Sequence, residues 1–459
     1  MKRGYITVFF ALVFMVLMSL IISLFMGIQI NAYKLKAESA YSVAANSILG
    51  EYHKELLEQY ELFYVDTSYN KGIPDYHQVE NHLWEYIEKN WSISPASVEI
   101  SQIVLATDNG GLSYRKQISE YMKDKIGMNY VKELSNLYVA ASKEGFVMDE
   151  AQMQRLWEKK CQETLAKKEE IPEKTWEKIE KVSSIEKAYS VRESFVLNQV
   201  VSEEADISKK FVNVSDLVSS RERIKGNGFE GELNIMDKIY FVAYLFEKFS
   251  CYTSDDTKEV LCYEIEYLLG DSGSDYENLS TVVKELLAIR EGLNVTYLLS
   301  DNDKMTLIKE VSSALSALVA SPELSPVFEI LIIGFWSYTE SINDVKSLLQ
   351  GGKIPLLKTK ATWSTDLESG LGLEVISNSL TSQENGMDYK QYLQMLMLFV
   401  DNEQLTFKSM DLIEMNVREI TGNENFRMDG LADYFLVNLV FEIPQFGRYQ
   451  IVRRFGYGM

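Results

Sequence analysis

The chain has 459 residues, 46% of them hydrophobic and only seven of them proline, so it can fold around a sizeable core and is not a largely disordered protein. Its formal net charge is −21, which excludes nucleic acid as a partner because affinity for phosphate needs clustered positive charge. The three cysteines, Cys161, Cys251 and Cys262, are too few for a disulfide framework, and pairing of Cys251 with Cys262 stays open.

An uncharged, apolar run extends from Tyr5 to Ala32, after a basic tip at residues 1–4. About 20 helical residues cross a hydrocarbon core of ~30 Å, so we predict a transmembrane helix at residues 5–32. A cleaved secretory signal would have a shorter apolar core followed by small residues at a cleavage site. We therefore interpret the run as a signal anchor that associates with the lipid bilayer.

Basic residues set the predicted orientation of this helix. Lys2 and Arg3 favour a cytoplasmic tip, although Lys34 and Lys36 on the far side reduce the charge difference. We predict a single-pass protein of the cell membrane with a cytoplasmic N-terminus and an extracytoplasmic bulk. The helical pattern continues without proline to about residue 60, with Gly50 as its one weak point.

Three polar or small residues, Gly27, Gln29 and Asn31, lie near the outer end of the apolar run. They are costly in lipid unless they meet another helix or reach the headgroup region. Both explanations stay open at this point, and the first predicts a helix–helix contact at these residues.

The opening stretch at residues 2–12 resembles the start of the TadE/TadG-like pseudopilins of the Flp (Tad) pilus system, with matches at Gly4, Thr7 and Val8. The resemblance implies a processing site between Gly4 and Tyr5. Phe9 stands where the pseudopilin pattern has an acidic residue that serves assembly. We therefore predict that most molecules keep their first residues and remain in the membrane.

Several later stretches are similar to a family of unknown function from Gram-positive bacteria whose members accompany Tad-type secretion genes. These stretches are residues 58–68, 263–270, 275–278, 289–294 and 351–357. The resemblance implies a pseudopilin-like or accessory component of the Tad apparatus that contacts other pseudopilin-like or secretion-platform proteins. It supplies no catalytic residues.

Beyond the anchor we predict three regions. Residues 33–110 form a membrane-proximal α+β region with strands near 61–67 and 98–106 and a helix at 76–90, and residues 111–225 form a charged helical arm. Residues 226–459 form a helix-rich α+β body. Its predicted elements are helices at 235–249, 276–294, 304–320 and 326–349, a strand at 261–267 and a hairpin of strands 434–443 and 449–455.

The predicted fold class is therefore α+β, with one N-terminal transmembrane helix that continues into a helix-rich ectodomain. We expect a small, mainly antiparallel sheet in which the C-terminal hairpin joins the strand at 261–267. In that strand, alternation places Glu264 and Glu266 on one face, most simply the solvated face.

No motif for catalysis, cofactor binding or metal binding emerges. The spaced glycines at 226–231 follow a charged segment instead of a buried strand and predict a turn. The three histidines, His53, His77 and His82, lack the spacing of a zinc site. We predict a protein that acts through contacts, without cofactor or metal. The alternative is a membrane-anchored extracytoplasmic hydrolase that uses acidic residues such as Glu264 and Glu266.

Overall fold

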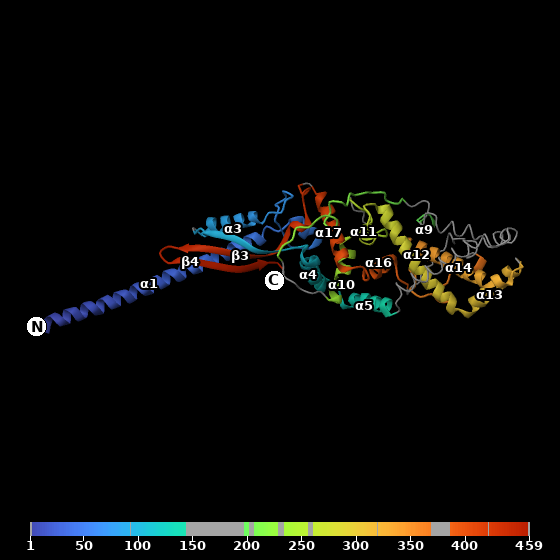
Figure 1. The fold of residues 1–459 in the computed structure, drawn as a ribbon, viewed down its shortest axis with the longest axis horizontal. Coiled ribbons are helices and arrows are strands. Elements are labelled where there is room, and N and C mark those ends of the chain that lie inside the picture. The colour runs from blue at the N-terminus through green and yellow to red at the C-terminus, as the bar shows by residue number, and fades with distance from the viewer. Residues whose placement is uncertain are drawn as a thin grey trace. The chain divides into compact units, whose positions relative to one another are not determined.

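The fold is α+β, as the sequence predicts, with a long apolar N-terminal helix and a small antiparallel sheet that contains a C-terminal hairpin (Figure 1). The computed structural model describes residues 2–91, 93–143, 197–201, 206–227, 234–255, 260–318, 320–368, 386–420 and 422–457. The chain divides into two compact units. The first comprises Met1–Tyr121, Leu217–Asp237 and Met410–Met459, and the second comprises Met122–Asp216 and Lys238–Ser409.

Helix α1 (Lys2–Leu49) is one continuous helix of 48 residues. It contains no proline, and its second half is rich in alanine, the strongest helix former. Among the described residues it is the one helix that is long and apolar enough to span a membrane. The predicted continuation beyond residue 32 is confirmed, and the helix ends in a turn at Gly50, the weak point in the sequence.

The sheet of the first unit has β3 (Leu431–Ile443) at its centre, flanked by antiparallel partners. On one side lies β2 (Ser97–Leu105), and on the other lie β1 (Val65–Asp66) and β4 (Gly447–Gly456), which pair with successive parts of β3. The predicted hairpin and the predicted strand near 98–106 are therefore confirmed. The predicted partner of the hairpin is wrong, because the hairpin pairs with β1 and β2 instead of residues 261–267.

The hairpin turn follows from its residues. Pro444 sets φ for the second position of the turn, and Gln445 then adopts a positive φ of 71°. The amide of Phe446 closes the turn on the carbonyl of Ile443 at 3.0 Å. Gly447 follows with φ of 95°, a conformation that glycine adopts without a steric cost.

The described part of the first unit also contains α2 (Lys54–Tyr60), α3 (Tyr76–Trp91), most of α4 (Asp108–Lys125), the second half of α17 (Asn402–Arg418) and η3 (Met428–Gly430). Helix α3 places Val79, Leu83 and Ile87 on one face at four-residue spacing, and all three are buried. That face packs in the same core as α1 and the sheet.

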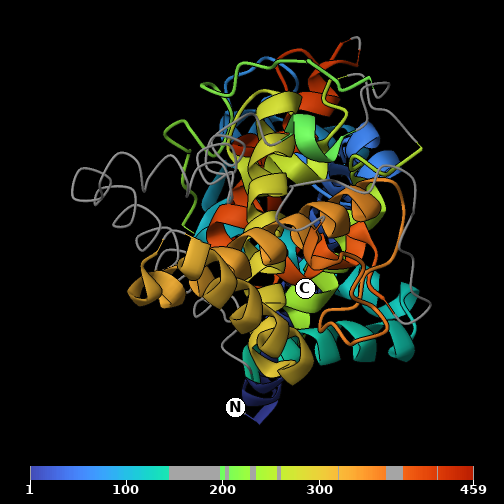
Figure 2. The same cartoon turned by 90° about the vertical axis from the view of Figure 1, so that its right-hand side faces the viewer.

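The described part of the second unit is helical. Its elements are α5 (Met128–Lys143), α9 (Leu197–Val200), most of α10 (Ile235–Lys248), α11 (Glu264–Gly270), α12 (Asp275–Ser300), α13 (Asn302–Leu318), η2 (Pro322–Leu324), α14 (Ser325–Leu349), α16 (Tyr389–Met397) and the first half of α17. Helices α12, α13 and α14 pack against one another, as the yellow and orange ribbons of Figure 2 show. The four helices predicted in this region are confirmed as α10, α12, α13 and α14.

The apolar stretch within α14 is buried, with Trp336 only 2% exposed, so it is a core helix as predicted. The strand predicted at 261–267 is wrong, because Tyr263 is the N-cap of helix α11. Most of the predicted charged arm, residues 144–196, lies outside the described residues, as does Cys161.

Candidate functional site

Helix α1 combines two surfaces of opposite character along one rod. From Tyr5 to Ile28, every large hydrophobic side chain is exposed, including Tyr5 itself at 78% and Phe9 at 62%. An apolar surface of this size is unstable in water and marks contact with lipid or with another protein. This half is the candidate membrane anchor (Figure 1).

The second half of α1 is packed against the sheet. Its buried residues recur every three or four positions and are mostly small: Ala37, Ala40, Tyr41, Ala44, Ala45 and Ile48. The facing residues alternate along β3 and β4, as one face of a sheet requires: Phe435, Val437, Leu439, Phe441, Ile451 and Phe455. The alanines let the helix backbone lie close to this aromatic and aliphatic face.

Polar contacts fix the position of α1 along β4. The hydroxyl of Tyr41 donates to the carbonyl of Arg454 at 3.3 Å, and the hydroxyl of Tyr457 donates to the carbonyl of Leu49 at 2.5 Å. Burial raises the pKa of Tyr41 to about 12, so this hydroxyl stays protonated and remains a donor at physiological pH.

A third polar group connects α3 to the end of α1. The carboxylate of Glu51 accepts a hydrogen bond from the hydroxyl of Tyr69 at 2.7 Å and another from Tyr86, and lies 3.0 Å from Nδ1 of His82. The three partners come from α3 and from the loop before it. Glu51 therefore holds the turn after α1 against the first unit.

The three histidines do not come together. Nδ1 of His53 accepts from the amide of Leu56 and caps α2, while His77 pairs with Glu80 at 2.7 Å on the surface. Within the part of the chain that the structure describes, no group of three metal-ligating side chains is present.

The residues that the sequence marks on α1 are all placed on the helix. Gly4 and Tyr5 lie in its first turns, so a processing site there would be part of a helix. Gln29 and Asn31 are exposed, and a Cβ added at Gly27 would meet no atom within 4 Å. Gly27 and Asn31 are four residues apart and share a face, whereas Gln29 lies on another face. Of these three residues, Gly27 and Asn31 can therefore meet the same partner helix, whereas Gln29 cannot.

Glu264 and Glu266, predicted on a solvated strand face, are instead fully buried at the start of α11. One oxygen of Glu264 accepts the amide of Ser250 at 2.9 Å and its hydroxyl at 3.0 Å. The prediction is wrong because the two carboxylates satisfy backbone amides and hydroxyls of a segment 14 residues earlier in the chain.

The carboxylate of Glu266 has hydrogen-bond partners at only one of its two oxygens. Oε1 of Glu266 accepts the amide of Tyr252 at 2.9 Å and the hydroxyl of Tyr389 at 2.7 Å, while its buried Oε2 has no hydrogen-bond partner. Burial raises the pKa of Glu266 to about 7. Cys251, which forms no disulfide with Cys262, is buried nearby, and burial raises the pKa of its thiol too.

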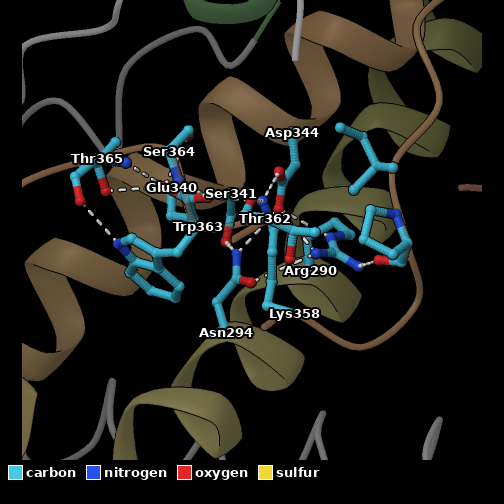
Figure 3. A network of polar contacts seen from close by, with 12 residues as sticks. Arg290, Asn294, Glu340, Ser341, Asp344, Lys358, Thr362, Trp363, Ser364 and Thr365 are labelled. Atoms are coloured by element: carbon cyan, nitrogen blue, oxygen red, sulfur yellow. Dashed lines mark hydrogen bonds and ion pairs between the residues drawn. The ribbon is translucent and has the colours of Figure 1, made fainter. Parts of the chain in front are cut away.

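A second buried polar cluster joins α12, α14 and the segment after α14 (Figure 3). Arg290 donates to Asp344 Oδ2 at 2.8 Å, and the Lys358 ammonium lies 2.6 Å from both Asp344 Oδ1 and Glu340 Oε1. Glu340 also accepts the amides of Ser364 and Thr365 at 2.9 Å. Although burial alone would raise the pKa of Asp344, Arg290 and Lys358 lower it overall.

This cluster contains two cations and two anions, all buried, so its net charge is zero. Paired and hydrogen-bonded charges of this kind fix how two helices and a loop pack, and they leave no ionised group directed at a substrate. The cluster is a structural element of the second unit.

A cavity of about 270 Å³ in the first unit is lined by one charged side chain, Lys225, together with apolar and uncharged residues. The lining residues are Thr67, Pro74, Tyr76, Ile100, Ile103, Leu105, Ile224, Lys225 and Asn227. The cavity thus has no carboxylate for acid–base chemistry.

Sequence reasoning found the apolar half of α1 but missed its docking onto the hairpin. The helical spacing of Ala37, Ala40 and Ala44, three and four residues apart, is a visible signal of a packed face, whereas the partner of this face lies about 400 residues away in sequence. Comparison with curated proteins and with solved structures finds no match for the chain. A family described as a family of unknown function (DUF5702) matches residues 174–443, which is more than half of the chain and leaves out α1. The chain therefore belongs to this family.

Proposed function

We propose that the protein is a non-catalytic, membrane-anchored envelope component, pseudopilin-like or accessory, of a Tad-type pilus or secretion apparatus. Its N-terminus is cytoplasmic and its folded mass is extracytoplasmic. The observation that carries the proposal is the continuity of α1: an exposed apolar half passes without a break into a half that is packed on the sheet.

This continuity has a mechanical consequence. A helix that is held along its second half by a core and by polar contacts cannot swing freely about a loop. The folded unit therefore keeps a fixed orientation relative to its anchor. A subunit of an assembly in the membrane needs such an orientation, whereas a tethered enzyme can work on a flexible linker.

The apolar half offers surface for a partner as well as for lipid. Small residues allow helices to approach closely in a bilayer, and an interhelical amide hydrogen bond contributes on the order of 0.6–2 kcal/mol. On one face near the outer end of this half, Gly27 supplies the small residue and Asn31 supplies the side-chain amide. The resemblance of the first twelve residues to pseudopilins supports a partner helix of that class.

The buried charges favour contact over catalysis. The carboxylates of Glu264 and Glu340 are occupied by protein donors. A glycoside hydrolase needs two carboxyl groups that face a substrate cavity, about 5–9.5 Å apart. Glu266 is fully buried, and the cavity of about 270 Å³ has no carboxylate. Asp108, Glu120 and Asp433 do line a second pocket, but its volume of about 30 Å³ is too small for a sugar ring, so these observations favour contact over the hydrolase alternative.

The experiment is a co-purification from native membranes. The tagged full-length protein is compared with a chain whose residues 5–30 are replaced by an unrelated spanning helix of equal length. Wild type should retain pilus-platform or pseudopilin-like proteins, and the exchange should lose them. The paired substitution of Gly27 and Asn31 by leucine should weaken retention, while the matched change of Ser19, also exposed on α1, should not.

Two other results of the co-purification would contradict parts of the proposal. Retention that survives the helix exchange unchanged places partner choice in the folded units and contradicts the helix contact. Absence of every Tad-type protein from the wild-type sample contradicts the proposed apparatus.

A further inference from the structure

Strand β4 runs beside α1 in the same direction, which places the hairpin turn at the membrane end of the helix. Three pairs of contacts establish the direction: Leu49 meets Tyr457, Tyr41 meets Arg454, and Glu38 meets Tyr449. The start of β4 thus lies beside an earlier part of α1 than the end of β4 does, so the strand and the helix run in the same direction. Figure 1 shows the red hairpin with its turn directed along the blue helix toward the N-terminus.

The level of the turn follows from helix and strand geometry. Lys34 Nζ lies 5.3 Å from the centre of the Tyr449 ring, and Glu38 accepts from the Tyr449 hydroxyl. From Tyr449 to Phe446, a strand advances about 10 Å, which equals about seven helical residues. The turn therefore lies level with about residues 27–31 of α1.

That level coincides with the headgroup layer. Counting about 20 residues from Tyr5 ends the hydrocarbon core near Leu24, and the headgroup layer adds ~5–7 Å, or about three to five residues. The turn thus reaches the surface of the bilayer if α1 spans it.

The composition of this end suits a lipid surface. In the segments 34–38 and 442–450, three side chains are basic and two are acidic, although the whole chain carries −21. The two acids have basic neighbours, since Glu442 lies 3.7 Å from Arg448 and Glu38 lies 3.3 Å from Arg453. The exposed Pro444 and the half-buried Phe446 form the tip.

We propose that the β3–β4 turn is a second membrane contact, in which Phe446 enters the headgroup layer and Arg448 and Lys34 bind anionic phospholipid headgroups. Basic side chains near an anionic surface each add attraction, and an aromatic ring at the boundary adds apolar burial. Two contacts at different points fix the rotation of the rigid helix in the membrane. The inference rests on the proposed insertion of α1.

The test uses the full-length chain in nanodiscs of zwitterionic lipid, with or without phosphatidylglycerol. Cys161 and Cys262 are changed to serine, and the buried Cys251 is kept. A sample with these two changes and no introduced cysteine shows that Cys251 is not labelled. A fluorophore is placed by Gln445→Cys at the turn. The matched control on the same strand is Val452→Cys, an exposed position about 20 Å farther from the membrane. Phe14→Cys reports insertion of α1.

Headgroup spin-labelled lipid should quench the label at position 445 several-fold more than the label at 452, and more strongly with phosphatidylglycerol. Arg448→Gln should remove the gain from the anionic lipid, and Phe446→Ser should lower quenching in both lipids. Equal quenching at 445 and 452, with position 14 quenched by mid-chain labels, overturns the second contact and leaves the anchor intact. Absence of quenching at position 14 overturns the anchor and this inference together.

Discussion

The hydroxyl of Tyr449 on β4 donates a 2.7 Å hydrogen bond to Glu38 on α1, across 411 positions of the chain. This bond raises the pKa of Tyr449, since ionisation would place a second negative charge beside the carboxylate. It connects the last strand to the long N-terminal helix. The two ends of the chain thus form one structural unit around the sheet.

The alanine face of α1 sets how closely the helix approaches that sheet. We predict that Ala40→Leu, at a fully buried position, overpacks the core and lowers the free energy of unfolding by about 1–3 kcal/mol. Ala32→Leu, at an exposed position on the same helix, should change it little. Thermal unfolding of both variants in detergent, followed by circular dichroism, provides the comparison. An unchanged Tm for Ala40→Leu would mean that α1 is not packed there.

The buried charge cluster of the second unit should be sensitive to loss of one charge. Arg290→Gln leaves the buried carboxylate of Asp344 with one cation fewer, so we expect a loss of about 3–5 kcal/mol in unfolding free energy. Lys360→Gln, which removes a solvent-exposed pair with Asp303, should have little effect. Denaturant titration measures both. Equal midpoints for the two variants would refute the structural role of the cluster.

The raised pKa of Glu266 leads us to predict that the stability of the protein depends on pH. Because its pKa rises from 4.5 to about 7 on folding, the folded state binds the proton more tightly, and stability falls as the pH rises through this interval. Glu266→Gln keeps the acceptor for Tyr252 and Tyr389 but cannot ionise. The variant should therefore gain up to about 3 kcal/mol relative to wild type between about pH 4.5 and pH 8. Parallel stability curves for the two proteins would contradict the assignment.

Local sequence patterns were sufficient to predict the helices and the hairpin whose signals lie within one short stretch of the chain. The apolar run from Tyr5 and the absence of proline predict α1, and the apolar stretch at 330–336 between charged flanks predicts a core helix. Pro444 and Gly447 between alternating runs predict the hairpin. Each of these signals is complete within about 30 residues.

Long-range contacts explain what sequence reasoning missed. The pairing of β3 with β2 joins residues more than 300 positions apart, and nothing in either strand alone selects the other. Around Glu264, apolar and polar residues alternate as in a half-exposed strand. The donors that satisfy Glu264 and Glu266 come from Ser250 and Tyr252 in the preceding segment, so both carboxylates can be buried on a helix.

The proposed role also makes a prediction about the N-terminus. Phe9 occupies the position of an acidic residue in pseudopilins and is exposed on α1 among apolar side chains. We expect most molecules to keep residues 1–4 and stay in the membrane fraction, as intact-mass measurement of detergent-extracted protein will show. Recovery mainly in sheared pili, with Tyr5 as the first residue, is the opposite result.

The central claim is that α1 crosses the membrane and leaves both folded units outside. The most direct test adds protease to intact cells from which the wall has been removed, with a tag at the C-terminus and a cytoplasmic protein as the lysis control. The account predicts that the tagged part is degraded while the cytoplasmic control survives. Full protection of the tagged part until the cells are lysed would contradict it.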